Sequence, residues 1–317
     1  RASSIGFSPA EPAPYTDEPR SGRNPLKIGA LVVLVVLALA YPFVFSLPYQ
    51  QHLAILVCLY ALMAVGWNIL GGYTGQVSLG NTIFFGVGAY TSTVLLKTFL
   101  ISPWVGLLVG VLLSIVLAVV VGYPCFRLKG HYFAIATIAV GEIMHTVAVN
   151  TQELGAAVGL QQPILPESWV NFQFHGTDKA PYYFIILAFL ALALLVVYRI
   201  ERSKMGYYFR AIKEDPEGAR ALGINITHYK LLAFILSAVF TSIAGTFYAQ
   251  YVLFIDPYTV LFLMVSVTMC LMAVLGGLGT LWGPVIGAVV LIAISETTRI
   301  QFGGTGGALD LLIYGFL

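Results

Sequence analysis

The stretch PWVGLLVGVLLSIVLAVVVGYP, residues 103–124, contains no charged side chain, and Arg127 and Lys129 follow it directly. A helix needs about 20 mainly apolar residues to cross the hydrocarbon core of a bilayer. The rest of the chain continues this pattern, because 59% of its residues are hydrophobic. Only 9% are charged, against roughly 25% in soluble domains. The sequence therefore predicts an all-α membrane protein with little left over for a separate soluble domain.

Ten apolar segments of this kind follow one another along the chain. They are 28–47, 52–71, 82–100, 103–124, 131–149, 182–199, 231–251, 259–276, 283–298 and 306–317. Gly80, Gly86 and Gly88 interrupt the third segment, so a broken or re-entrant helix is an alternative there. We expect residues 1–27, rich in proline and polar residues, to form a disordered tail. The transmembrane domain is then 28–317, and we expect its C-terminus to be truncated.

The lysine and arginine residues indicate how the chain is oriented. With ten spans and the N-terminus inside, all but three of the 16 basic residues fall on the cytoplasmic side. The three exceptions are Lys97, Lys179 and Arg299. Cytoplasmic loops of membrane proteins carry such an excess. This pattern predicts a cytoplasmic N-terminus, an external segment over 150–181 and a large cytoplasmic loop over 200–230.

Two of the spans carry small residues at every fourth position. The first stripe is Gly106, Gly110, Ser114, Ala118 and Gly122, and the second is Ala233, Ser237, Thr241, Gly245 and Ala249. Small residues at this spacing allow helix backbones to approach closely in lipid. We interpret both stripes as packing surfaces of a compact bundle.

The cytoplasmic loop contains a short helix with clear signals at both ends. Asp215 is a good N-cap, Pro216 suits the first helical position, and Gly223 can end the helix. Its apolar positions, Ala219, Leu222 and Ile226, would either dock into a groove of a partner or belong to a solvated connecting helix. These residues alone leave both alternatives open.

Several stretches of the chain resemble one family of transport proteins. The loop EDPEGARALG, residues 214–223, resembles the coupling-helix motif of ABC importer permeases. More narrowly, residues 50–317 resemble the LivM-type permeases for branched-chain amino acids. The motifs that carry this resemblance are GGYTGQVSLG at 71–80, FFGVGAY at 84–90, GHYFAIAT at 130–137, Met205-Gly206 and LGGLGTLWGP at 275–284.

The resemblance implies an ABC importer permease bundle, type II-like, with about ten transmembrane helices. It implies a second, related permease subunit, two cytosolic ATPase subunits and an external substrate-binding protein. The expected location is the bacterial cytoplasmic (inner) membrane. The ATPase-coupling residues would be Glu214, Asp215, Pro216, Glu217, Ala219, Arg220, Leu222 and Gly223. Branched-chain or related hydrophobic amino acids are the implied substrates, while relatives that carry urea or short amides are an alternative.

No phosphate-binding GxxxxGK[ST] loop occurs in the chain. We therefore expect a transport subunit rather than an enzyme, with no cofactor of its own and with ATP bound by partner subunits. Cys58, Cys125 and Cys270 lie far apart and show no metal-ligand spacing. An ion-coupled secondary transporter would need charge pairs in several spans, and only Glu142 with His145 suggests one.

Polar residues within the spans are candidates for a translocation path. Glu142 and His145 lie three residues apart on one predicted helix face, and either line this path or form a packing pair. Asn68, Gln76, Ser78 and Asn81 flank the glycine-rich region near the second and third spans. Broken helix ends in this region would offer backbone groups to a zwitterionic amino acid.

Overall fold

The computed structural model describes residues 36–45, 47–128, 130–174 and 179–302. The chain divides into two compact units, residues 1–44 and 45–317. In the first unit, residues 36–44 are helical. The predicted tail at 1–27 and the predicted last span at 306–317 lie outside the described residues.

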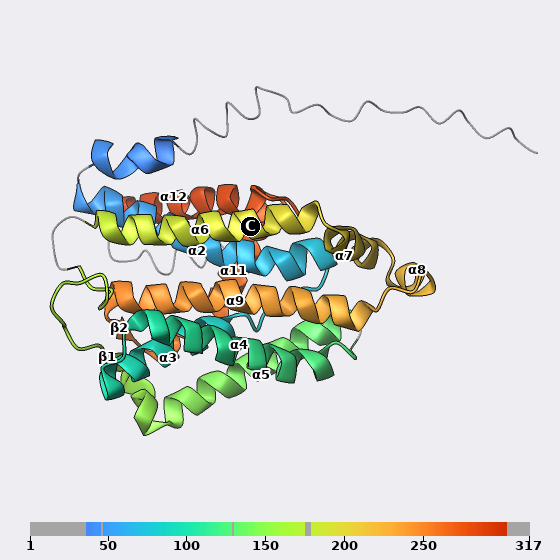
Figure 1. Cartoon of the computed structure of the whole chain (residues 1–317), viewed down its shortest axis with the longest axis horizontal. Coiled ribbons are helices and arrows are strands. Elements are labelled where there is room, and N and C mark those ends of the chain that lie inside the picture. Colours follow the sequence, from blue (N-terminus) through green and yellow to red (C-terminus); the bar gives the residue numbers. More distant parts are fainter. Residues whose placement is uncertain (1–35, 46, 129, 175–178, 303–317) are drawn as a thin grey trace, which may run out of the picture. The chain divides into compact units, whose positions relative to one another are not determined.

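The second unit is almost entirely helical (Figure 1). Its helices are α2 (Pro48–Thr74), α3 (Thr82–Phe99), α4 (Pro103–Cys125), α5 (His131–Asn150), α6 (Ala180–Glu201), α7 (Lys204–Glu214), α8 (Pro216–Ala221), α9 (Ile226–Val252), α10 (Pro257–Val260), α11 (Leu263–Gly276) and α12 (Gly283–Phe302). Two short 3-10 helices, η1 (Gln152–Leu154) and η2 (Ala156–Val158), follow α5. Strands β1 (Leu160–Gln161) and β2 (Phe254–Ile255) pair antiparallel.

Six segments of the described chain are long and apolar enough to cross a membrane. They are α2, α4, α5, α6, α9 and the pair α10–α11 taken together, Pro257–Gly276. A shorter apolar stretch, Gly283–Thr298, lies in α12. The predicted all-α membrane class is therefore confirmed, whereas the described residues do not establish ten spans.

The third predicted span, 82–100, is the continuous helix α3, with the irregular backbone just before it, over 75–81. The eighth span, predicted as one helix over 259–276, is instead broken between α10 and α11. The break between α10 and α11 falls within apolar sequence, whereas the segment 75–81 contains Gln76, Ser78 and Asn81.

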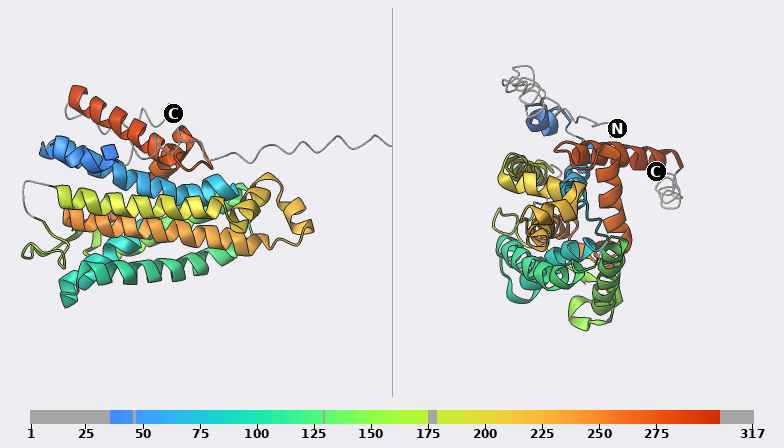
Figure 2. Two further views of the ribbon diagram at one scale, coloured as in Figure 1. Left: turned by 45° about the horizontal axis from the view of Figure 1, so that its top comes forward. Right: turned by 90° about the vertical axis from the view of Figure 1, so that its right-hand side faces the viewer.

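Helix α9 packs against α2, α3 and α4 (Figure 2). Both predicted stripes of small residues are buried. A Cβ added at Gly88 would overlap the carbonyl oxygen of Ser242, and one added at Gly245 would overlap that of Phe85. In addition, Thr246 Oγ1 donates to the Gly88 carbonyl at 3.0 Å. The small residues therefore let α3 lie directly against α9; the sequence predicted close packing at the α9 stripe but not that α3 is its partner.

Candidate functional site

Helix α8 is built by the local signals that the sequence contains. The Asp215 carboxylate accepts a hydrogen bond from the Glu217 amide at 3.0 Å, and Pro216 occupies the first turn. Arg220 pairs with Glu217 at 3.2 Å. Gly223 has a φ of 83°, a conformation that favours glycine and ends the helix. The predicted caps are thus present, and α8 lies beyond α7 at one end of the bundle (Figure 1).

The apolar residues of α8 face two different ways. Ala219 is buried in a cluster with Ile212 of α7 and Ile226 of α9. By contrast, the side chain of Leu222 is 82% exposed. Of the three apolar positions Ala219, Leu222 and Ile226, two hold α8 onto its own chain, namely Ala219 and Ile226. Only Leu222 of the three is therefore exposed to a partner.

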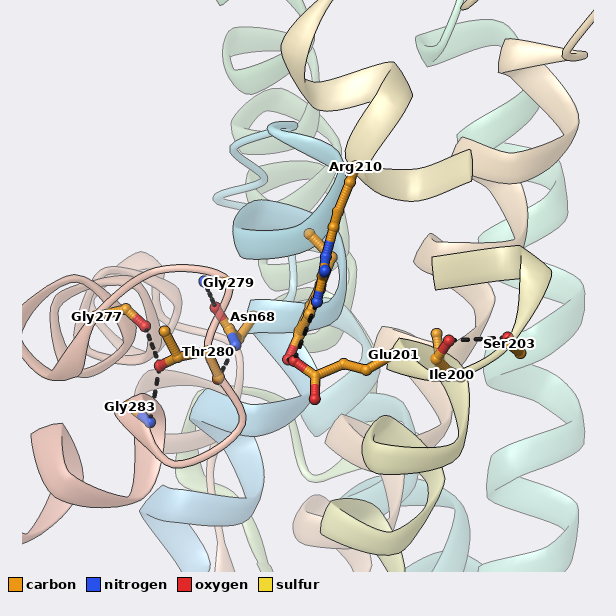
Figure 3. A network of polar contacts seen from close by, with 10 residues as sticks. Asn68, Ile200, Glu201, Ser203, Arg210, Gly277, Gly279, Thr280 and Gly283 are labelled. Atoms are coloured by element: carbon orange, nitrogen blue, oxygen red, sulfur yellow. Dashed lines mark hydrogen bonds and ion pairs between the residues drawn. The ribbon is translucent and has the colours of Figure 1, made fainter. Parts of the chain in front are cut away.

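A polar network joins α7 to the bundle (Figure 3). Tyr73, near the end of α2, donates from its hydroxyl to Glu201 at 2.8 Å, and Arg210 of α7 lies 3.8 Å from the same carboxylate. Glu201 is the last residue of α6. One carboxylate therefore connects α2, α6 and α7.

Asn68 ties α2 to the loop between α11 and α12 (Figure 3). Its Nδ2 donates to the Thr280 carbonyl at 3.0 Å, and its Oδ1 accepts from the Gly279 amide at 2.9 Å. Lys213 of α7 reaches the same loop, since a Cβ at Gly279 would lie 3.3 Å from its Nζ. The loop that follows α11 therefore contacts both α2 and the segment that carries α8.

The irregular segment 75–81 is held inside the bundle by buried polar groups. Trp67 Nε1 donates to the Ser78 carbonyl at 2.6 Å, and Asn81 Nδ2 donates to Ser237 Oγ at 2.7 Å. Ser78 and Asn81 are fully buried. Ser237 lies about 16 Å along α9 from its first residue, taking 1.5 Å per residue. The segment therefore returns from the end of α2 to the middle of the bundle before α3 begins.

The break between α10 and α11 meets the start of α3. Thr82 Oγ1 donates to the Val260 carbonyl at 3.1 Å and approaches that of Phe262 at 3.3 Å. The Thr82 amide donates to Ser266 Oγ at 2.7 Å. Backbone groups freed by both breaks thus find partners among hydroxyl side chains.

On α5, Glu142 and His145 form a pair at the surface of the described chain. Glu142 Oε1 lies 3.5 Å from His145 Nδ1, and the exposed side-chain fractions are 66% for Glu142 and 13% for His145. The His145 ring meets the edge of Tyr258 on α10, with centroids 5.2 Å apart. Glu142 is therefore not a packing partner of another helix in the described part of the chain.

The six predicted path residues do not form one cluster. Asn68 fixes the loop after α11, Ser78 and Asn81 support the irregular segment, and Gln76 is half-buried beside them. Glu142 and His145 lie on α5. Sequence reasoning missed the buried hydroxyls at the breaks, namely Thr82, Thr137, Ser237 and Ser266. Thr82 has a local signal, because it follows the glycine-rich stretch 71–80, whereas the other three lie in apolar helical sequence without one. No group of three metal-ligating side chains occurs among the described residues.

Similarity to known proteins covers most of the chain. The family described as "Branched-chain amino acid transport system / permease component" matches residues 50–317. The chain is 30% identical to the high-affinity branched-chain amino acid transport system permease proteins LivM of Salmonella typhimurium and of Escherichia coli K12, over 85% of this chain and 68% of each relative. LivH of Escherichia coli K12 is 26% identical over 73% of this chain and 79% of that protein. No solved structure shows significant similarity to the chain. The chain belongs to the family of permease components of branched-chain amino acid transport systems.

Proposed function

We propose that this chain is the membrane-spanning permease subunit of an ABC importer for branched-chain or related hydrophobic amino acids. The observation that carries the proposal is α8, a capped helix that exposes Leu222 and lies fixed to α7 and α9 through Ala219. It occurs in a chain whose relatives are named as permeases of branched-chain amino acid transport systems. A capped helix anchored on one side and exposed on the other suits contact with a partner protein.

The proposed assembly contains a second, related permease subunit, two cytosolic ATPase subunits and an external substrate-binding protein. The bundle would be type II-like and would lie in the bacterial cytoplasmic membrane with its N-terminus inside. The basic residues support this orientation. Lys179 Nζ lies 3.4 Å from the Tyr251 hydroxyl, at the end of α9 that is far from α8, whereas the basic loop 200–230 carries α8. The positive-inside rule then favours the cytoplasmic side for α8.

The contacts of α7 suggest how movement of α8 reaches the transport path. A shift of α7 acts on α2 and α6 through Glu201, and on the loop after α11 through Lys213. ATP-driven closure of the ATPases would thus move several helices together. Such coupling requires that the nucleotide bind the two states with different affinity. We retain Glu142 and His145 as residues of the path and propose that Asn68, Ser78 and Asn81 support its irregular backbone, with Gln76 beside it.

The test is leucine uptake by the transporter reconstituted with its partner subunits, binding protein and ATP in proteoliposomes. We expect ATP-dependent uptake of leucine, isoleucine and valine in preference to urea or acetamide. Reversing two charges, Glu214→Lys with Glu217→Lys, should abolish the ATPase stimulation and the uptake while the chain still inserts. The neutral pair, Glu214→Gln with Glu217→Gln, should be less impaired. Uptake that persists without ATP, or normal uptake in the charge-reversed variant, would contradict the proposal.

A further inference from the structure

The carboxylate of Glu142 is exposed near the middle of a membrane-spanning helix. Glu142 is the twelfth of the 20 residues of α5, about 17 Å from one end of the helix and about 12 Å from the other. The hydrocarbon core of a bilayer is about 30 Å thick. Two-thirds of the side chain is exposed, and within the described residues its one ion-pair partner is His145, at 3.5 Å. A lipid-facing α5 would therefore place a carboxylate in hydrocarbon, which is strongly unfavourable.

The buried residue next to Glu142 shows what lies at this level of the bundle. Gly141 packs over the irregular segment 75–81, since a Cβ there would lie 3.9 Å from Gly80 Cα and from the Thr82 methyl. The break that precedes α11 lies at the same level, and Phe262 at this break is exposed. Irregular backbone inside a membrane is tolerated where protein or a water-filled cavity covers it. The exposed carboxylate and the exposed break before α11 thus lie at one level of the bundle and point to a polar path there, whereas the part of the segment 75–81 next to Gly141 is buried.

The outward face of α4 provides the contrast. Its exposed positions Leu108, Leu112, Val116 and Val120 are all aliphatic. The exposed positions of α5 around Glu142 are mixed, because Ile135 and Ala139 precede it and Thr146 follows it at helical spacing. A face with one carboxylate, one hydroxyl and aliphatic neighbours offers partners for the ammonium group and the aliphatic side chain of a zwitterionic amino acid, while the carboxylate of that amino acid needs a partner elsewhere.

We propose that Glu142 is the residue that receives the α-ammonium group of the amino acid during its passage, on a path bordered by α5 and the break before α11. The inference rests on the proposed function and adds a recognition residue to it. An ionised carboxylate accepts hydrogen bonds only, and an ammonium group donates three. Charge-assisted hydrogen bonds of this kind are stronger than neutral ones. Ile135 and Ala139 would lie along the aliphatic part of the substrate.

The first test measures whether water reaches this position. In the complete transporter with Cys270 replaced by alanine, Glu142→Cys should react with a charged, water-soluble methanethiosulfonate reagent. Leu112→Cys on α4, whose native side chain is 62% exposed, is the matched control and should react far more slowly. Leucine delivered by the binding protein should slow the labelling of Glu142→Cys. Labelling as slow as that of the control would overturn the inference.

The second test measures recognition. We expect Glu142→Gln to lower leucine uptake about tenfold or more, as the loss of a charged hydrogen-bond partner predicts. ATPase stimulation by the loaded binding protein should persist, and Glu142→Asp should restore part of the uptake. Ile143→Ala, next to Glu142 and also exposed, should remain within about twofold of the wild type because it removes no charge.

The outcomes separate this inference from the proposed function. If the wild type imports leucine and Glu142→Gln imports it equally well, Glu142 does not recognise the substrate. If Glu142→Gln no longer co-purifies with its partner subunits, the carboxylate holds the assembly together, and the inference also fails. A wild-type transporter that does not import leucine would instead contradict the proposed function.

Discussion

Both ends of the Asn68 amide are used, one by the carbonyl of Thr280 and the other by the amide of Gly279. The side chain of Asn68 is buried in an apolar helix, whereas Gly279 is half-buried and Thr280 is exposed. A typical intramolecular hydrogen bond contributes about 0.5–1.5 kcal/mol to stability. This single residue therefore fixes the loop between α11 and α12 against α2.

We predict that Asn68→Ala lowers the free energy of unfolding by about 1–3 kcal/mol, the sum for two hydrogen bonds. Thermal unfolding of the purified protein in detergent measures this loss. Asn150→Ala is the matched control, because Asn150 is exposed and its Nδ2 bonds to the carbonyl of Thr146 in its own helix. Equal stability of the two variants would show that the loop does not depend on Asn68.

Residue identity predicted which side chains are unusual but not what each one does. Asn68, Ser78 and Asn81 stand out as polar residues in the sequence, and all three are buried and hydrogen-bonded in the described chain. Their partners lie far away in the sequence, since Asn81 bonds to Ser237 and Asn68 to Thr280. Glu142 stands out in the same way but lies at the surface. Only the tertiary structure separates these two cases.

At the scale of elements, α3 and α9 approach so closely that glycine is needed at the contact. A Cβ at Gly245 would overlap the Phe85 carbonyl oxygen, which is backbone and cannot move away alone. Thr246 also bonds to the Gly88 carbonyl at this contact. Separation of the two helices would therefore break a buried hydrogen bond as well as the packing.

We predict that Gly245→Ala destabilises the protein by about 1–3 kcal/mol, the usual cost of overpacking. The yield of monodisperse protein and its unfolding temperature measure the effect. Gly141→Ala serves as the control, because the nearest atoms to an added Cβ there lie at an ordinary contact distance of 3.9 Å. The close-packing argument fails if both alanine variants retain wild-type stability.

Helix α8 gives a prediction that concerns binding rather than folding. Leu222 is 82% exposed, so Leu222→Ser should leave the unfolding temperature unchanged. If α8 docks into an ATPase subunit, loss of a central apolar side chain should cost more than about 1 kcal/mol and weaken association several-fold. Co-purification and ATPase stimulation measure this. Val158→Ser is the matched control, because Val158 is also 82% exposed. It lies in η2, after the C-terminal end of α5 and outside α8. Equal effects of the two variants would count against docking through α8.

At the scale of the whole molecule, the lengths of the apolar stretches in the sequence predicted the continuous helices well. The predicted span 103–124 corresponds to α4 (Pro103–Cys125), and 131–149 corresponds to α5 (His131–Asn150). The break between α10 and α11 was not predictable from local sequence. It depends on Thr82, which binds the carbonyls of Val260 and Phe262 from another part of the chain. Hydropathy describes burial in lipid and contains no information about such a contact.

The network around Glu201 makes a prediction about coupling across the whole molecule. This carboxylate accepts from Tyr73 of α2 and pairs with Arg210 of α7, so it connects three helices near α8. Glu201→Gln keeps an acceptor for Tyr73 but removes the charge that holds Arg210. Because Arg210 is exposed, we expect a stability loss of at most about 1 kcal/mol. The number of leucine molecules imported per ATP hydrolysed should nevertheless fall, since α7 would move without α6.

Simultaneous measurement of uptake and phosphate release in proteoliposomes gives this ratio. Arg202→Gln is the neighbouring control, because Arg202 is exposed and stacks on Tyr198 of its own helix, 4.3 Å from the ring centroid. A lower ratio in Glu201→Gln alone would show that the carboxylate transmits movement. An unchanged ratio with lower stability would mean that it only fastens α7 to α6, and transmission would then have to run through Lys213 and the loop after α11.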